Sequence, residues 1–321
     1  MDKLIKISSI TKKIVVALLG AFLLLFLLFH ATANLLVLKD DGGSAYSAFC
    51  HFMGSNIIVK IFEILLLASI LLHIILTIIL WFQNKKARPI PYHIPTKSKT
   101  APSSKLMILT GTLLLICIGL HFYDFYLVKI GVVKRIYMAK IEDIQSDEVI
   151  TLQHYCDQME TTPQDFIGQY EQNLEVYKSM LPEDDFSKLA NETEAMKRAI
   201  PVIDFLQRID NSMVSSDHKW ITQINYDDKV LLEKAIPTID VEPDFYNMVH
   251  QLFKRPLMVV MYLLFFAILW FHMRHAFEAA FQTLGLSNYK YYRAIEIIGI
   301  IYAWCICLMF ASIPIGILLL F

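Results

Sequence analysis

The sequence predicts an all-α membrane protein with five transmembrane helices and a largely helical extramembrane insert between helices three and four. Two observations predict this class. Hydrophobic residues make up 56% of the chain and charged residues only 18%, whereas an ordinary globular domain is about 45–50% apolar and about 25% charged. The apolar residues also gather in five stretches, each near the roughly 20 residues that cross a bilayer. The net charge of -1 excludes a general attraction to nucleic acid.

The five predicted spans are residues 14–38, 57–82, 106–128, 256–281 and 294–321. The first resembles a signal peptide in its preceding lysines and its Ala31-Thr32-Ala33 motif. Its apolar run exceeds the roughly 7–15 residues of a signal core and continues past that motif, so we expect a retained span.

Basic residues predict the orientation. They are concentrated before the first span, in the loop between spans two and three, and before the fifth span, whereas the loop after the first span offers only Lys39 beside Asp40 and Asp41. The positive-inside bias therefore predicts a cytoplasmic N-terminus and an extracytoplasmic C-terminus.

The predicted domains are membrane helices 1–3 at residues 1–133, an acidic extracytoplasmic insert at 134–255, and membrane helices 4–5 at 256–321. The insert holds 13 basic and 23 acidic residues, a net charge of -10. Thr162, followed by Pro163, predicts a helix start. A second helix is expected near residues 185–198, with Pro201 interrupting the chain beyond it. Pairing of Cys50 with Cys156 stays open.

Histidines inside the spans are the main indication of function, because ionisable residues in a membrane are expensive and point to a functional site. His30 and His121 each lie 16 residues from the predicted inner edge of their spans, and His73 and His272 each lie 16 residues from the outer edge. At ~1.5 Å per residue, these positions define one pair in the outer half and one in the inner half.

Two pairs at matched depths suit two bis-histidine haems in a bundle of the first four helices, because haem iron takes one axial ligand on each face. The alternative is a set of unrelated buried histidines. Without a C-x-x-C-H motif, the haems would be non-covalent b haems. His275, with Arg274, is expected to meet a haem propionate or the inner membrane surface. Residues that could admit or hydrogen-bond a macrocycle are Gly20, Asn34, Ser69, Thr110, Gly111 and Gly119.

A wider pattern surrounds these histidines. It comprises Ser8 to Lys13 before the first span, His30-x-x-x-Asn34, Glu63 ahead of His73, His121-Phe122-x-Asp124-Phe125, and His272-x-x-His275-x-Phe277 continuing to Gly285. The pattern resembles the five-helix dihaem cytochrome b subunit of succinate dehydrogenase and fumarate reductase. The likeness covers residues 1–135 and 245–321, and the insert departs from it.

The resemblance implies a subunit in a bacterial cytoplasmic membrane that anchors a flavoprotein and an iron–sulfur subunit on its cytoplasmic face. It implies electron exchange with a quinone, usually menaquinone, through an outer haem on His30 and His121 and an inner haem on His73 and His272. Glu63, next to Phe62, is the candidate catalytic proton carrier. The alternatives are another dihaem membrane cytochrome, such as a cytochrome b561-like reductase, and a haem-free anchor or transporter.

Overall fold

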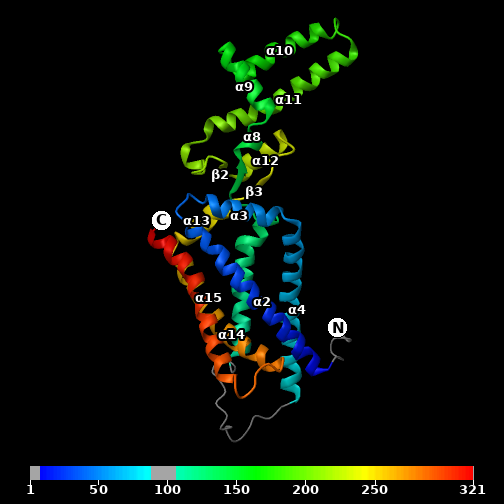
Figure 1. Cartoon of the computed structure of the whole chain (residues 1–321). Coiled ribbons are helices and arrows are strands. Elements are labelled where there is room, and N and C mark those ends of the chain that lie inside the picture. Colours follow the sequence, from blue (N-terminus) through cyan, green and yellow to red (C-terminus); the bar gives the residue numbers. More distant parts are fainter. Residues whose placement is uncertain (1–7, 88–105, 321) are drawn as a thin grey trace. The chain divides into compact units, whose positions relative to one another are not determined.

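The computed structural model describes residues 8–87 and 106–320, and these are mostly helical. The chain divides into two compact units (Figure 1). The first comprises Met1–Lys39, Ala48–Phe122 and His250–Phe321, and the second comprises Asp40–Ser47 and Tyr123–Val249. The short segment Asp40–Ser47 therefore belongs with the insert, which was not expected from the sequence.

Five helices of the structure are long and apolar enough to span a membrane, as predicted. Each begins and ends within about a turn and a half of its predicted bounds. They are α2 (Ser9–Asn34, with a 3-10 turn at Leu35–Leu38), α4 (Ile57–Ala87), α6 (Met107–His121), α14 (Pro256–Thr283) and α15 (Tyr292–Leu320). Beyond His121, α6 continues through a π-helical turn, Phe122–Tyr126, into α7 (Leu127–Lys129).

Helix α14 is the centre of the first unit. It packs against α2, α6 and α15, and α2 packs in addition against α4 and α15. Within the described ranges, α2 makes no extensive contact with α6, nor α4 with α14 or α6. The first four spans therefore form a bundle in which α2 and α6 lie on one diagonal and α4 and α14 on the other.

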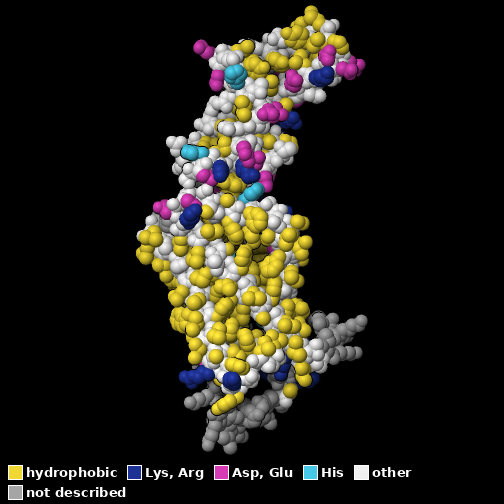
Figure 2. Space-filling model, in the orientation of Figure 1, with side chains coloured by type: hydrophobic (Ala, Val, Ile, Leu, Met, Phe, Trp, Pro, Cys, Tyr) yellow, Lys and Arg dark blue, Asp and Glu magenta, His cyan; other side chains and the backbone are white. Residues whose placement is uncertain are grey.

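The surface of the bundle is that of a membrane protein. Figure 2 shows a nearly continuous hydrophobic face along its helices, with lysine and arginine side chains at one end. The exposed hydrophobic residues include Leu25, Ile58, Ile116, Leu264 and Leu308. Lys85 and Lys86 lie in the last turn of α4. An apolar flank on every helix suits contact with lipid, where exposed apolar side chains cost nothing.

The second unit combines four longer helices with a small sheet. The helices are α9 (Asp147–Met159), α10 (Pro163–Tyr177), α11 (Glu183–Arg208) and α12 (Tyr226–Ala235), and shorter ones are α8 (Ile141–Ile144), α3 (Ser44–Ser55) and α13 (Phe245–Phe253), the last two also reaching into the first unit. The antiparallel sheet has the order β2-β1-β3 and is formed by Trp220–Ile224, Tyr137–Lys140 and Val241–Pro243. A largely helical insert was expected, so the sheet is a difference from the prediction.

A compact apolar core holds this unit together. Its fully buried side chains include Ile144, Leu152, Val202, Phe205 and Leu232, which come from helices on both sides of the sheet in sequence. The core explains the course of α11. Pro201 was expected to interrupt the chain, but α11 continues through it to Arg208. The prediction was wrong because burial of the following Val202 and Phe205 outweighs the backbone hydrogen bond that proline cannot make.

The start of α10 is as predicted. The Thr162 side chain accepts a hydrogen bond from the Asp165 N–H at 3.1 Å, and Pro163 occupies the first helical position. Such a cap satisfies one of the backbone donors that a helix start leaves open. All five cysteines are free thiols, so Cys50 and Cys156 do not pair.

Hydrogen bonds to Asp217 attach the segment Asp40–Ser47 to the second unit. The Ser44 hydroxyl donates to Asp217 Oδ2 at 2.6 Å, and the Ser215 hydroxyl donates to Oδ1 at 2.7 Å. Partial burial by itself raises the pKa of Asp217. The bonds from Ser44 and Ser215, with that from the Lys219 N–H, outweigh this effect and hold the pKa below its usual 3.8. The ionised carboxylate is therefore the form that the folded unit stabilises.

We expect Ser44→Ala to lower the stability of the detergent-solubilised chain by about 1–2 kcal/mol, because a hydrogen bond to a charged acceptor is lost. A depressed carboxyl pKa stabilises the fold above the unfolded-state pKa, and this contribution is lost as the pH falls through the folded-state value. The deficit of the variant should therefore be complete at neutral pH and shrink as the pH falls below about 4. Thermal unfolding against pH measures it. Ser187→Ala on exposed α11, whose hydroxyl bonds only its own helix, is the matched control, and an equal loss in both variants would contradict the assignment.

Candidate functional site

The five intramembrane histidines all lie in the first unit. His30 is on α2, His73 on α4 and His121 at the end of α6, while His272 and His275 are on α14. Four of them face the interior of the bundle in two groups, at two levels along the helices.

His30 and His121 form the first pair. Their ring centres are 6.0 Å apart and the ring planes are inclined by 80°. Two imidazoles that bind one metal ion from opposite sides, each with a metal–nitrogen bond near 2 Å, have ring centres roughly 6 Å apart. Because axial ligands of one metal can be rotated freely about the bond axis, the inclination is compatible with ligation. The matched depth predicted for these two histidines is confirmed, and ligation of haem stays a prediction.

The second pair comprises His73 and His272. The His73 ring makes a hydrogen bond to the backbone of Val16 on α2, and a Cβ at Gly20 would lie 3.8 Å from its Cε1. The His272 ring lies against α6, where a Cβ at Gly111 would lie 3.5 Å from its Cε1. His73 and His272 lie close enough to interact electrostatically. The small residues predicted at Gly20 and Gly111 therefore do leave room for histidine rings.

Each pair lies on a diagonal of the bundle. α2 and α6 carry one pair and α4 and α14 carry the other, and in the described part of the chain neither helix couple packs extensively together. A flat ligand between facing imidazoles needs this separation, because directly packed helices would leave no room for it. The arrangement can therefore hold two planar metal complexes one above the other.

Thr110 fixes the orientation of the His272 ring. Its hydroxyl donates to the Met107 carbonyl at 3.0 Å, so its oxygen can accept from His272 Nδ1, 3.4 Å away. The proton then resides on Nδ1 and the lone pair on Nε2. This is the tautomer that a metal-binding histidine requires, with its second nitrogen held by an outer partner.

Asn34 plays the corresponding part at His30. Its amide nitrogen lies 3.2 Å from His30 Nδ1 and donates to the His30 carbonyl at 2.7 Å. In this arrangement Nδ1 is an acceptor. Ligation through Nε2 requires the amide to turn over, so that its oxygen accepts the Nδ1 proton. Phe26 stacks on the same ring at 5.2 Å.

The π-helical turn Phe122–Tyr126 follows His121 directly. Single π turns inside α-helices occur mostly at functional sites, where the additional residue changes which side chains share a helix face. This turn could not be expected from the sequence, because π turns have no distinctive residue pattern.

Arg274 and His275 lie apart from the His272 ligand position. The Arg274 guanidinium is 5.8 Å from the Trp270 ring, and Trp270 packs on Trp304 of α15 at 5.2 Å. Arg274 is thus on the α15 side of α14, whereas His272 faces α6. His275 interacts electrostatically with His272. The structure therefore separates Arg274 from the two histidine pairs.

Glu63 lies near the outer pair along α4. Its neighbour Phe62 lines an apolar pocket of about 200 Å³ with Phe22, Leu25, Phe26 and Phe29 of α2. Because Phe26 also stacks on His30, this pocket extends from the position next to Glu63 to the first histidine pair. Glu63 itself is half-buried. Phe62 and Glu63 were expected from the sequence, but the four α2 side chains were found only from the structure.

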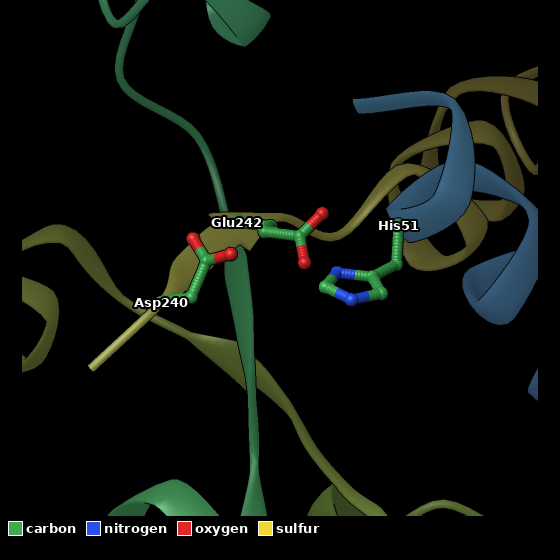
Figure 3. Close-up of side chains that lie close together, drawn as sticks. All are labelled: His51, Asp240 and Glu242. Carbon is green, nitrogen blue, oxygen red and sulfur yellow. The ribbon is translucent and has the colours of Figure 1, made fainter. Parts of the chain in front are cut away.

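The second unit presents two further carboxylates. Figure 3 shows Asp240 and Glu242 at strand β3, and it also shows His51 on α3. Alternate residues of a strand project to one face, and the carboxylate oxygens of these two lie within 4.8 Å of each other. A protein metal centre takes three or four ligands, so the two carboxylates of β3 are not one by themselves.

Comparison with protein-family models, with curated proteins and with solved structures finds no match to this chain. The class of protein is therefore defined by the fold and the site together. It is a five-helix membrane protein with two pairs of buried histidines on the diagonals of its bundle.

We expect Gly20→Leu and Gly111→Leu to destabilise the bundle by about 1–3 kcal/mol each, because the leucine methyl groups would occupy the space of the His73 and His272 rings. Gly119→Leu is the control, since a Cβ there meets nothing within 4 Å. Thermal unfolding in detergent compares the three variants. Equal stability of Gly111→Leu and Gly119→Leu would show that His272 does not lie against α6.

Proposed function

We propose that this chain is the membrane-anchor and electron-transfer subunit of a succinate:quinone oxidoreductase or quinol:fumarate reductase, with two non-covalent b haems. The observation that carries the proposal is the arrangement of His30 with His121 and of His73 with His272 on the two diagonals. Two facing imidazoles per level match the axial ligand set of a b haem. The sequence pattern around these histidines supports the family.

The residues present fit the two haems. His30 and His121 would hold the outer haem, and His73 and His272 the inner one. When bound, the haems supply one-electron redox chemistry in a medium of low dielectric. The chain determines their spacing. His73 lies against Val16 and Gly20 of α2, and His30 is ten residues beyond Gly20, so the two levels are roughly 15–20 Å apart along the helix.

The charge distribution supports the orientation and the partners. The lysines and arginines at one end of the bundle favour the cytoplasmic side of a bacterial cytoplasmic membrane, with the N-terminus inside and the C-terminus outside. The flavoprotein and iron–sulfur subunits would bind this face. The exposed turn between α14 and α15, with Tyr289, Lys290 and Tyr291, supports such docking. His93, which was also expected there, lies outside the described residues.

The quinone, menaquinone in the family that the sequence resembles, would bind near the outer haem. Its ring suits the phenylalanine-lined pocket between α2 and α4, because such pockets hold mostly apolar ligands with a few polar groups at their edge. Reduction of a quinone takes up two electrons and two protons. Glu63 would transfer protons between water and a quinone oxygen, since a carboxylate within reach of the reacting atom can act as general acid and base.

We expect two b haems per chain, measured by the pyridine haemochrome assay on the purified chain. His30→Ala or His121→Ala should remove the outer haem alone, and His73→Ala or His272→Ala the inner one, so that each variant retains about half the haem. His275→Ala is the control and should retain both. A haem-free wild-type chain would favour a simple anchor or transporter. Loss of a haem in His275→Ala with none lost in His272→Ala would overturn the ligand assignment.

We expect Glu63→Gln to retain both haem spectra, because glutamine has the same shape, yet to slow haem reduction by a menaquinol analogue by roughly 10²-fold, the scale of general acid–base catalysis. Stopped-flow absorbance measures this rate. Reduction by dithionite, and succinate oxidation by an artificial acceptor at the soluble subunits, are the controls and should be unchanged. A normal rate with menaquinol would show that Glu63 has only a structural part.

A further inference from the structure

Lys12 lies on the same face of α2 as the residues that contact His73. Lys12, Val16 and Gly20 are spaced four residues apart, so they form a single row along the helix. The His73 ring makes a hydrogen bond to the Val16 backbone, and Gly20 lies beside it. The lysine is therefore one helical turn, about 5–6 Å, from the level of the inner histidine pair.

Lys12 is also buried, in contrast to its neighbour. Only 2% of Lys12 is exposed, whereas Lys13 is exposed. The Lys12 ammonium donates a hydrogen bond to Gln83 Oε1 of α4 at 2.9 Å, which directs it toward the same helix that carries His73. A buried ammonium is costly even when it is hydrogen-bonded. Its retention between α2 and α4 indicates a use for the charge at this place.

We propose that Lys12, held by Gln83, binds a propionate carboxylate of the inner haem and thereby sets its reduction potential. This inference rests on the proposed function. The propionates are the only anionic groups at the edge of a haem, and they lie on one side of the ring. Lys12 offers a buried cation one turn from the level of the ligand His73, on the side where the basic residues gather. A charge-assisted hydrogen bond in a medium of low dielectric is among the strong ones.

The electrostatic effect has a definite sign. A nearby positive charge favours the reduced haem, which carries one positive charge fewer than the oxidised form. Removing the charge of Lys12 therefore lowers the reduction potential of the inner haem. The outer haem is an internal reference, because His30 lies 18 residues from Lys12, about 27 Å along α2.

The test is an equilibrium redox titration of the full-length, haem-loaded chain, followed by its visible spectrum. In Lys12→Gln the neutral side chain can still bond Gln83. The ratio of reduced to oxidised inner haem at a fixed ambient potential should fall roughly tenfold, which equals about 59 mV for one electron. Lys13→Gln, the matched control, removes the same charge from an exposed neighbour and should leave both potentials unchanged. Lys12→Arg should restore the potential.

The outcomes separate this inference from the proposed function. A wild-type chain without haem would overturn both. Two haems with an unchanged inner potential in Lys12→Gln, or equal shifts in Lys12→Gln and Lys13→Gln, would overturn the role of Lys12 alone. Loss of only the inner haem in Lys12→Gln, with both haems retained in Lys12→Arg, would support it. If Lys12→Gln fails to fold, Lys12→Arg and Gln83→Leu are titrated instead, and an unchanged inner potential in Gln83→Leu counts against the inference.

Discussion

The packing of α14 against three neighbours is the constraint on which the arrangement of the site depends. Lipid offers no hydrophobic driving force between helices, so close van der Waals contact determines how they associate. α15 makes a close approach, since a Cβ at Gly299 would lie 2.8 Å from the Phe277 ring. The Phe266 ring stacks on Phe310 at 5.4 Å. These contacts fix the rotation of α14 about its axis, and that rotation turns His272 toward α6.

The span positions and histidine depths could be predicted from the sequence because both depend on local properties. An apolar run of sufficient length forms a helix across a membrane wherever it occurs, since its backbone must be satisfied internally. Counting residues along such a helix gives depth directly, and His30 and His121 do lie together. The diagonal placement could not be predicted, because it depends on which helices pack and residue counting carries no information on this. The separation of Arg274 from His272, two residues away, likewise follows from helix rotation.

The second unit was less predictable for a different reason. Its sheet is built from short strands far apart in sequence, and Tyr137–Lys140 has no regular alternation of polar and apolar residues. Pairing of such strands is determined by the core they cover rather than by their own propensity. The bond between Ser44 and Asp217 joins residues 173 positions apart, and nothing local signals it. By contrast, Thr162 caps α10 through an interaction within four residues, which the sequence does reveal.

The dependence of α6 on α14 has a consequence for biogenesis. Among the described residues, α14 is the one helix with which α6 makes extensive contact inside the bundle. The ribosome synthesises residues 130–255 between the two, which takes roughly 6–25 s at 5–20 residues per second. During this interval α6 is inserted with His121 facing lipid, while α2 and α4 can already associate. The intermediate with three helices in the membrane therefore exposes a polar side chain, and it is the stage at which membrane-embedded quality control or an insertion chaperone would have a target.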